Sequence, residues 1–249
     1  SPPEFLNDPL DSKMSIAEEY ERAKSLVQKK DTPDGRKSFL LWLLNGSHVF
    51  NDQKTKKQWN LNDALQQFIS QLGILALSKT ATDPLLWSHY SDGHKGVCLE
   101  FDSTRLSINE AFISDDVQYA EKPPYVDLFL SLVEELGEFV KPWDNQPYPI
   151  EQGDSFYTRQ LSKLMRANLL VKSQKWRYEE EYRMVASKPG AKVFDPIALK
   201  KVICGMKIQP CDVTTIRNIL SHPKFAHVEL EHVAHLQGSF DFTVSPMNL

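Results

Sequence analysis

Apolar residues in much of the chain recur with the period of an α-helix. Spacings of three and four residues over 16–27 and 61–69 mark two amphipathic segments, and Asn60 stands where it could cap the second. The apolar block 38–44 is too short to cross a membrane and predicts a buried helix. The predicted helices are 16–27, 38–44, 61–69, 126–140 and 157–169, the last two on either side of a Pro-rich surface loop at 141–149.

Short apolar runs bounded by Gly, Thr or Asp predict strands elsewhere. The runs 73–78 and 96–102 are typical of buried strands, and the segment between them is expected to be a loop. The last third turns mainly to strands, with a short helix around 213–220. The later predicted strands are 181–186, 201–205, 227–233 and 240–244.

These elements together predict the fold class. Strands interrupted by helices favour an α+β fold with a central mixed, largely antiparallel sheet and several inserted helices. We expect one domain over 1–249, with helical insertions at about 12–70 and 124–172.

Composition and charge narrow the class of protein. The 249 residues are 41% hydrophobic and 25% charged, which is ordinary for a soluble globule. A formal net charge of −4 gives no overall attraction to nucleic acid, although it leaves a local basic face open. The three cysteines are not closely spaced in sequence, which predicts free thiols in a reducing compartment. The sequence shows no membrane-spanning run and no signal-peptide pattern, so we expect a cytoplasmic protein without a membrane partner.

The segment Asp83-Pro-Leu-Leu-Trp-Ser-His-Tyr-Ser-Asp-Gly-His-Lys-Gly96 concentrates chemistry-bearing residues. Two aromatic rings, two imidazoles, hydroxyls and an ammonium fall between two predicted strands. The alternative is structural: Trp87 and Tyr90 would be core residues, and Gly93 and Gly96 would serve only a turn. The segment alone leaves both readings open.

A second cluster is Trp176-Arg-Tyr-Glu-Glu-Glu-Tyr-Arg183. If a strand opens at Glu181, period-two alternation places Glu179 and Glu181 on one face. Two carboxylates on one face can divide acid/base or cation-stabilising work. The alternative is an acidic strand end paired with Arg177 and Arg183.

Other polar residues carry weaker signals. Asn7 and Asp8 lie in a turn-forming segment, Phe5-Leu-Asn-Asp-Pro-Leu-Asp11, that offers side-chain oxygens. The remaining histidines lack metal-ligand spacing and receive no role. Basic residues at 163–177 could form a nucleic-acid face or simply a solvated helix side.

Three sequence segments, 5–11, 86–102 and 176–183, together resemble motifs of the bacterial domain-of-unknown-function 2971 family. The later run Leu199-Lys-Lys-Val-Ile-Cys-Gly205 is similar to that family's C-terminal strand. The family normally begins with a Tyr-rich segment and a strand ahead of the Asn-Asp-Pro turn, so we expect an N-terminal strand to be missing here. The resemblance implies a bacterial protein and brings no activity with it.

A more distant likeness is to ADP-ribosyltransferase-like folds. It implies that Ser78 and the Trp87–Tyr90 segment line a nicotinamide pocket, with NAD as a substrate and Glu181 as the catalytic carboxylate. Glu179 would orient or deprotonate an acceptor, which could be a macromolecule. The residues then expected to hold the ligand are Ser78, Trp87, Ser88, His89, Tyr90, His94, Lys95, Asn7, Asp8 and Arg183.

Three hypotheses of function follow. The first is a transferase or glycohydrolase acting on a nucleotide donor through Glu181 and Glu179. The second is a metal-assisted hydrolase or nuclease that uses His89, Asp92 and His94, although their spacing is poor for a metal site. The third is a non-enzymatic binding module in which the acidic cluster only pairs with Arg183.

Overall fold

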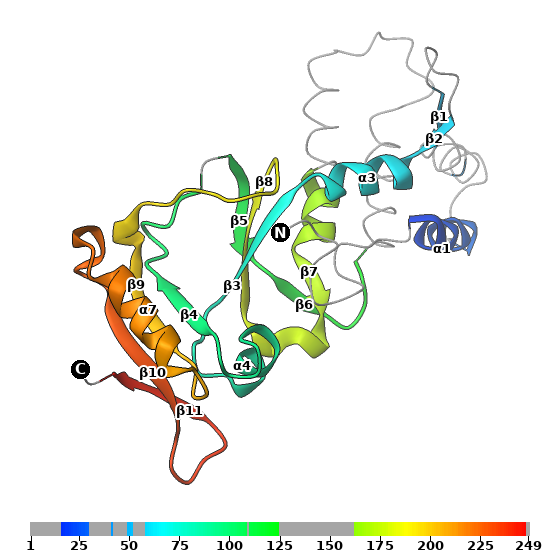
Figure 1. The fold of residues 1–249 in the computed structure, drawn as a ribbon. Helices are drawn as coiled ribbons and strands as arrows, with labels where there is room; N and C mark the ends of the chain where they lie inside the picture. The colour runs from blue at the N-terminus through cyan, green and yellow to red at the C-terminus, as the bar shows by residue number, and fades with distance from the viewer. Residues whose placement is uncertain are drawn as a thin grey trace. The chain divides into compact units, whose positions relative to one another are not determined.

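The computed structural model of the chain describes residues 16–29, 41, 49–51, 58–108, 110–124 and 162–247 (Figure 1). These residues form helices together with mixed and antiparallel sheets, so the predicted α+β class is confirmed. The strands are divided between separate sheets. Among the described residues, no helix has the length and apolar character that crossing a bilayer requires.

The chain divides into two compact units. Unit 1 contains residues 1–73 and 117–174, and unit 2 contains residues 74–116 and 175–249. Both segments expected to be helical insertions fall almost wholly within unit 1. The expectation of one domain stays a prediction.

Unit 1 has short strands and helices whose apolar faces are buried. Ala23, Val27 and Ile69 are almost fully buried on its helices, as helical spacing predicts. Residues 162–169 are also helical, whereas most of the predicted helices 38–44 and 126–140 lie outside the described residues. Its elements are α1 (Ile16–Lys29), β1 (Val49–Asn51), β2 (Gln58–Asn60), α3 (Leu61–Ser70), β6 (Gln118–Ala120) and β7 (Val171–Ser173).

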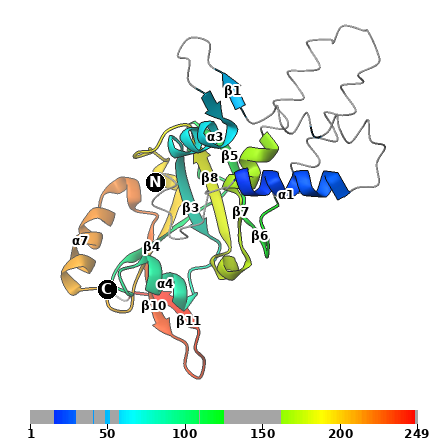
Figure 2. The same ribbon diagram turned by 90° about the vertical axis from the view of Figure 1, so that its right-hand side faces the viewer.

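Unit 2 contains two sheets (Figures 1 and 2). The three-stranded sheet has the order β3-β8-β5, and the four-stranded sheet has the order β11-β10-β9-β4, with β9 and β10 parallel and the other pairs antiparallel. The strands are β3 (Gly73–Ser78, its first residue at the boundary of the units), β4 (Val97–Phe101), β5 (Ala111–Asp116), β8 (Glu181–Ala186), β9 (Leu199–Cys204), β10 (Glu229–His235) and β11 (Phe242–Pro246).

The helices of unit 2 are short. The longest is α7 (Pro210–Leu220), which extends the predicted 213–220 helix and begins with a proline at its first turn. The others are α4 (Pro84–Tyr90) and the 3-10 turns Gln174–Glu179, Pro196–Ala198 and Pro223–Phe225.

One face of the four-stranded sheet carries the core of unit 2. Trp87 of α4 packs there against Ile203 and Val233, with Cys98 and Val244 at the margin of the cluster. Cys98 lies opposite Ile203 and Val233 opposite Val244. Ile203 lies opposite Glu231, two residues before Val233, so all four side chains share a face. Trp87 is only 4% exposed, and its Nε1–H donates a 2.7 Å hydrogen bond to the Ala81 carbonyl.

A tight turn joins α4 to β4. Asp92, Gly93 and His94 all have positive φ, and the Ser91 carbonyl accepts hydrogen bonds from the Lys95 and Gly96 amides. The turn lies directly against the end of β9: the His94 carbonyl accepts from the Lys207 amide, and a Cβ atom at Gly205 would lie 2.2 Å from that carbonyl oxygen. Glycine at 205 is therefore required by close backbone approach.

Gly205→Ala should lower the free energy of unfolding by about 1–3 kcal/mol, because the backbone of the His94 turn must shift to admit a methyl group. Denaturant unfolding measures the change. Gly238→Ala is the control. Its positive φ disfavours alanine, but no atom lies within 4 Å of an added Cβ, so this variant measures the backbone effect without a steric contact. A loss at Gly205 smaller than the loss at Gly238 would contradict this account of the contact.

Candidate functional site

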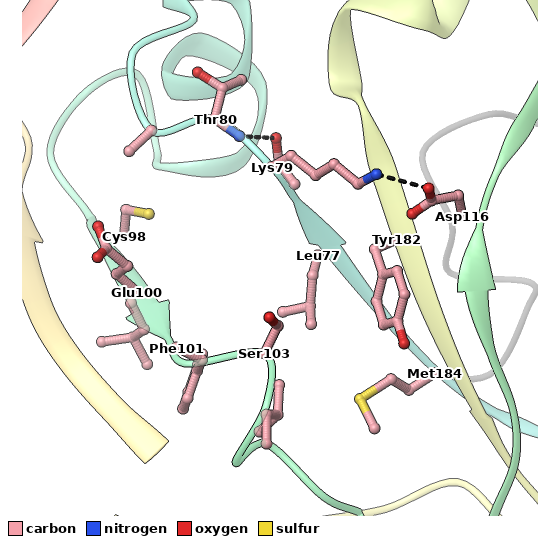
Figure 3. Close-up of a pocket in the computed structure, with 14 residues that line it drawn as sticks. Leu77, Lys79, Thr80, Cys98, Glu100, Phe101, Ser103, Asp116, Tyr182 and Met184 are labelled. Carbon is pink, nitrogen blue, oxygen red and sulfur yellow. Dashed lines mark hydrogen bonds and ion pairs between the residues drawn. The ribbon is translucent and has the colours of Figure 1, made fainter. Parts of the chain in front are cut away.

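A cavity of about 610 Å³ in the described part of unit 2 is a candidate for a functional site (Figure 3). Its size is typical of ligand sites. Strands of both sheets form its walls: β3, β8 and β5 on one side, and β4 with the turn that follows it on the other. The lining residues are Leu77, Ser78, Lys79, Thr80, Ala81, Cys98, Leu99, Glu100, Phe101, Ser103, Leu106, Asp116, Tyr182 and Met184.

The wall from the three-stranded sheet carries an ion pair and an aromatic ring. Lys79 Nζ lies 2.7 Å from Asp116 Oδ2. Asp116 and Tyr182 are partners in the β5–β8 register, which puts both side chains on the same face. Both members of the pair are about half exposed, so its contribution to stability is small, but it neutralises the ammonium at the cavity.

The wall from β4 carries a thiol and a carboxylate. Cys98 and Glu100 are two residues apart on this strand, so their side chains leave it on the same side. Burial raises the pKa of the Cys98 thiol, and the negative charge of Glu100 raises it further. The thiol is therefore held in its neutral form at neutral pH.

Behind Glu100, the same sheet face is rich in carboxylates. Glu100 lies opposite Lys201 in the β4–β9 register. The ammonium of Lys201 lies 3.1 Å from Glu231 and 3.6 Å from Glu229. The hydrogen bond that Lys201 donates to Glu231 raises the pKa of Lys201 most. Burial opposes this rise, and the charges of Glu231, Glu100 and Glu229 add to it. Three carboxylates thus surround one ammonium, and the Glu100 side of the cavity is negative.

The Asp83–Gly96 segment is not the loop that the sequence suggested. Asp83 caps a helix, since its side chain accepts from the Leu85 and Leu86 amides and Pro84 occupies the first turn. Helical geometry turns Trp87 into the core, where it does not line the cavity. The structural reading of Trp87 is the correct one.

The strands on either side of that segment are also less buried than expected. Only the first residues of β3 are buried, and no residue of β4 is fully buried. The reason is that β3 and β4 are terminal strands of their sheets, which the runs of apolar residues could not reveal.

The other residues of the segment are mostly at the surface. Ser88, His89 and Lys95 are exposed, and Lys95 lies 3.4 Å from Asp92 in an exposed pair. His94 packs edge-on against Phe242, and its buried Nδ1 has no hydrogen-bond partner among the described residues. None of these four lines the cavity.

Tyr90 joins the two predicted clusters. It is 56% exposed, and its hydroxyl donates a 2.6 Å hydrogen bond to Oε1 of the buried Glu179. The segment Trp87–Tyr90 and the acidic segment 176–183 are therefore in contact, although Tyr90 and Glu179 are 89 residues apart in the sequence. Tyr90 is not the core residue that the structural reading proposed.

The predicted alternation of Glu179 and Glu181 on one strand is wrong. Glu179 ends the 3-10 turn, Glu180 has a positive φ of 43°, and β8 begins only at Glu181. Within β8, Tyr182 and Met184 line the cavity, so Glu181 and Arg183 point to the other face.

Glu181 and Arg183 form a buried ion pair on that other face. The Arg183 guanidinium contacts both carboxylate oxygens of Glu181, at 2.5 Å and 3.1 Å, and the side chains are 0% and 5% exposed. This bidentate geometry is the favourable one for buried charges. The structural alternative predicted that Glu181 pairs with an arginine, and this pair is present. It was expected to be exposed to solvent at a strand end, but it is buried.

Of the predicted ligand-binding residues, Ser78 lines the cavity and the other described ones do not. Asn7 and Asp8 lie outside the described residues. Among the described residues, no group of three or more histidine, cysteine, aspartate or glutamate side chains is arranged to hold a metal ion. The roles predicted for Glu179 and Glu181 stay predictions.

Apart from Ser78, sequence reasoning missed the polar residues that line the cavity, namely Lys79, Thr80, Cys98, Glu100, Ser103, Asp116 and Tyr182. A charged residue inside the run predicted as a buried strand, Glu100, was a signal that one side of that strand is open. The others gave none, because β5 was not predicted and the cavity depends on strands meeting in space.

Comparison with known proteins identifies a family similar to part of the chain. The model of the family described as "Protein of unknown function (DUF2971)" matches residues 86–184, from within α4 to within β8. The chain is thus similar to this family over that stretch, and the predicted resemblance is confirmed there. No curated protein and no solved structure matches the chain. The likeness to ADP-ribosyltransferase-like folds stays a prediction.

We expect Glu181→Gln to lower the free energy of unfolding by about 3–5 kcal/mol, because it removes the charge that faces the buried guanidinium. Arg183→Met should cost a similar amount, and the double variant should cost clearly less than the sum of the two. A double-mutant cycle from denaturant unfolding provides the measurement. Additive losses would show that the two charges do not depend on one another.

Alkylation of Cys98 should follow an apparent pKa above that of an ordinary cysteine. Glu100→Gln should lower this pKa and speed the reaction at pH 8, since it removes a charge that disfavours the thiolate. A Cys211→Ser background leaves buried Cys204 as the other thiol, and mass spectrometry follows the rate with iodoacetamide. Glu229→Gln is the control, and an equal acceleration there would contradict a direct effect of Glu100.

Proposed function

We propose that unit 2 is a ligand-binding domain whose cavity binds a small organic group that is flat and positively charged. The observation that carries the proposal is the Glu100 carboxylate on the cavity wall, on the side where acidic groups outnumber basic ones. The Lys79 ammonium at the opposite wall is already paired with Asp116. The lining therefore favours a cation over an anion.

The shape and the aromatic lining support a flat group. Tyr182 presents its ring at the cavity, and Leu77 and Met184 add apolar surface beside it (Figure 3). A planar cation gains from a ring face, from dispersion against apolar side chains and from a carboxylate at its edge. Such a ligand satisfies all three kinds of lining residue.

The nicotinamide ring of an NAD-type donor has this chemistry, so the ligand class predicted from sequence is compatible with the cavity. The donor's phosphates would need cations, and the one ammonium of the lining is paired with Asp116. Glu181 is held by Arg183 on the other face of β8. We therefore propose cation binding, and group transfer is not part of the proposal.

Two probes with the same ring test the proposal. We expect 1-methylnicotinamide, which is cationic, to bind the full chain about tenfold more tightly than neutral nicotinamide, because only the former is attracted by Glu100. Titration calorimetry or ligand-observed NMR measures both affinities. The difference should disappear in Glu100→Gln.

Glu229→Gln is the matched control, because Glu229 belongs to the same acidic cluster but does not line the cavity. It should retain most of the preference. Equal affinity for the two probes, or a preference that survives Glu100→Gln, would refute the proposal.

A further inference from the structure

The free edge of β4 is the starting point. β4 is the last strand of its sheet. One edge of β4 pairs with β9, and the sheet has no strand on the other edge of β4 among the described residues. The Gly205 amide donates to the Gly96 carbonyl, and the Asp102 amide donates to the Ala198 carbonyl. Because antiparallel pairs alternate, the even-numbered residues of β4 direct their backbone groups toward β9. The N–H and C=O groups of Val97, Leu99 and Phe101 therefore point away from β9.

The cavity lies along this free edge. Residues 98–101 line it without interruption, although successive side chains of a strand point to opposite faces. Leu99 is 45% exposed and its side chain leaves the strand on the face opposite Cys98 and Glu100, so we infer that a cavity lined by all three runs along the edge of the strand. The cavity thus combines the Glu100 carboxylate with main-chain donors and acceptors that have no partner among the described residues.

We propose that the ligand is an extended peptide that adds as a strand beside β4 and places an arginine next to Glu100. This inference rests on the proposed cation site, since the guanidinium is the flat cation. A residue opposite Glu100 on an added strand lies about 4.5–5.5 Å away between Cβ atoms, within reach of a bidentate pair. Main-chain pairing supplies affinity and the arginine supplies specificity.

The neighbours of that arginine should be apolar. Residues next to it in the peptide lie opposite Leu99 and Phe101 and point to the other face, where Leu99 is 45% exposed. Covering these side chains removes apolar surface from water. The preferred sequence is therefore apolar-arginine-apolar in extended form.

A peptide fits this edge better than a second copy of the chain does. The edge opens into a cavity of about 610 Å³, which suits one extended segment and not the edge of a folded sheet. Two copies paired through β4 would also bring their Glu100 carboxylates close together, and like charges on paired strands are destabilising.

The first experiment varies the peptide. Acetyl-Thr-Val-Arg-Val-Thr-amide should bind the full chain, measured by titration calorimetry. Replacing its arginine by glutamate, or methylating the peptide nitrogens that face β4, should each weaken binding about tenfold or more, because one removes the cation and the other removes main-chain donors. Two N-methylated peptides are made, one methylated at the odd-numbered nitrogens and one at the even-numbered nitrogens. One of the two then blocks the N–H groups that face β4, whichever way the peptide is aligned.

The second experiment varies the chain. Leu99→Pro removes the one N–H of Leu99, which faces away from β9, so the sheet should survive while peptide affinity falls about tenfold. Leu99→Val keeps the N–H and is the matched control. Amide hydrogen exchange gives a readout on the wild type: Val97, Leu99 and Phe101 should exchange faster than Cys98 and Glu100, and the peptide should slow them.

The outcomes separate the two proposals. If N-methylated and parent peptides bind equally while 1-methylnicotinamide still depends on Glu100, strand addition is wrong and the cation site stands. If no cationic probe binds, both proposals are wrong. Association of the chain through β4, seen as a dimer that Leu99→Pro abolishes, would also overturn the peptide assignment. Should Leu99→Pro fail to fold, the methylated peptides still decide.

Discussion

The packing of Trp87 against the four-stranded sheet is the constraint on which the site of unit 2 depends. The indole packs against Ile203 and Val233, and its N–H donates a hydrogen bond to the Ala81 carbonyl. The segment that connects β3 to β4 is therefore held against the sheet near its start, at Ala81, and in its middle, at Trp87. The turn after α4 then runs into close backbone contact with Gly205, which aligns β4 on β9. With this anchor in place, β3 and β4 end one sheet each, and the cavity lies where they face one another (Figure 3).

The carboxylates of unit 2 are divided by their surroundings. Glu181 is buried against Arg183, and Glu179 is buried where the Tyr90 hydroxyl donates to it, so both stabilise the junction between the 3-10 turn, α4 and β8. Asp116 is paired with Lys79 at the cavity. Glu100 stands apart because it faces the cavity and shares the single ammonium of Lys201 with two other carboxylates. Desolvated charges with dedicated partners act in stability, whereas a carboxylate on a cavity wall is available to a ligand.

The same contrast holds for the backbone. The even-numbered groups of β4 are satisfied by β9, while the odd-numbered groups border a cavity that also contains a carboxylate and aromatic rings. Natural sheets usually protect such an edge, and the proposed peptide would supply both main-chain hydrogen bonds and a cation to it. This links the proposed cation site and the proposed strand addition through one element.

The sequence by itself determined the α+β class and the positions of β3, β4, β8, β9, β10 and β11 to within about two residues, because periodicity and turn residues act locally. It did not determine that Asp83 caps a helix, that Glu179 lies outside β8, or that β3 and β4 are edges. Those features depend on which strands pair and on which side chains meet across 89 residues, as in Tyr90 and Glu179. Only the tertiary structure decided that Glu181 faces a buried arginine and that Glu100 faces the cavity, because the environment of a charge is set by residues distant in the chain.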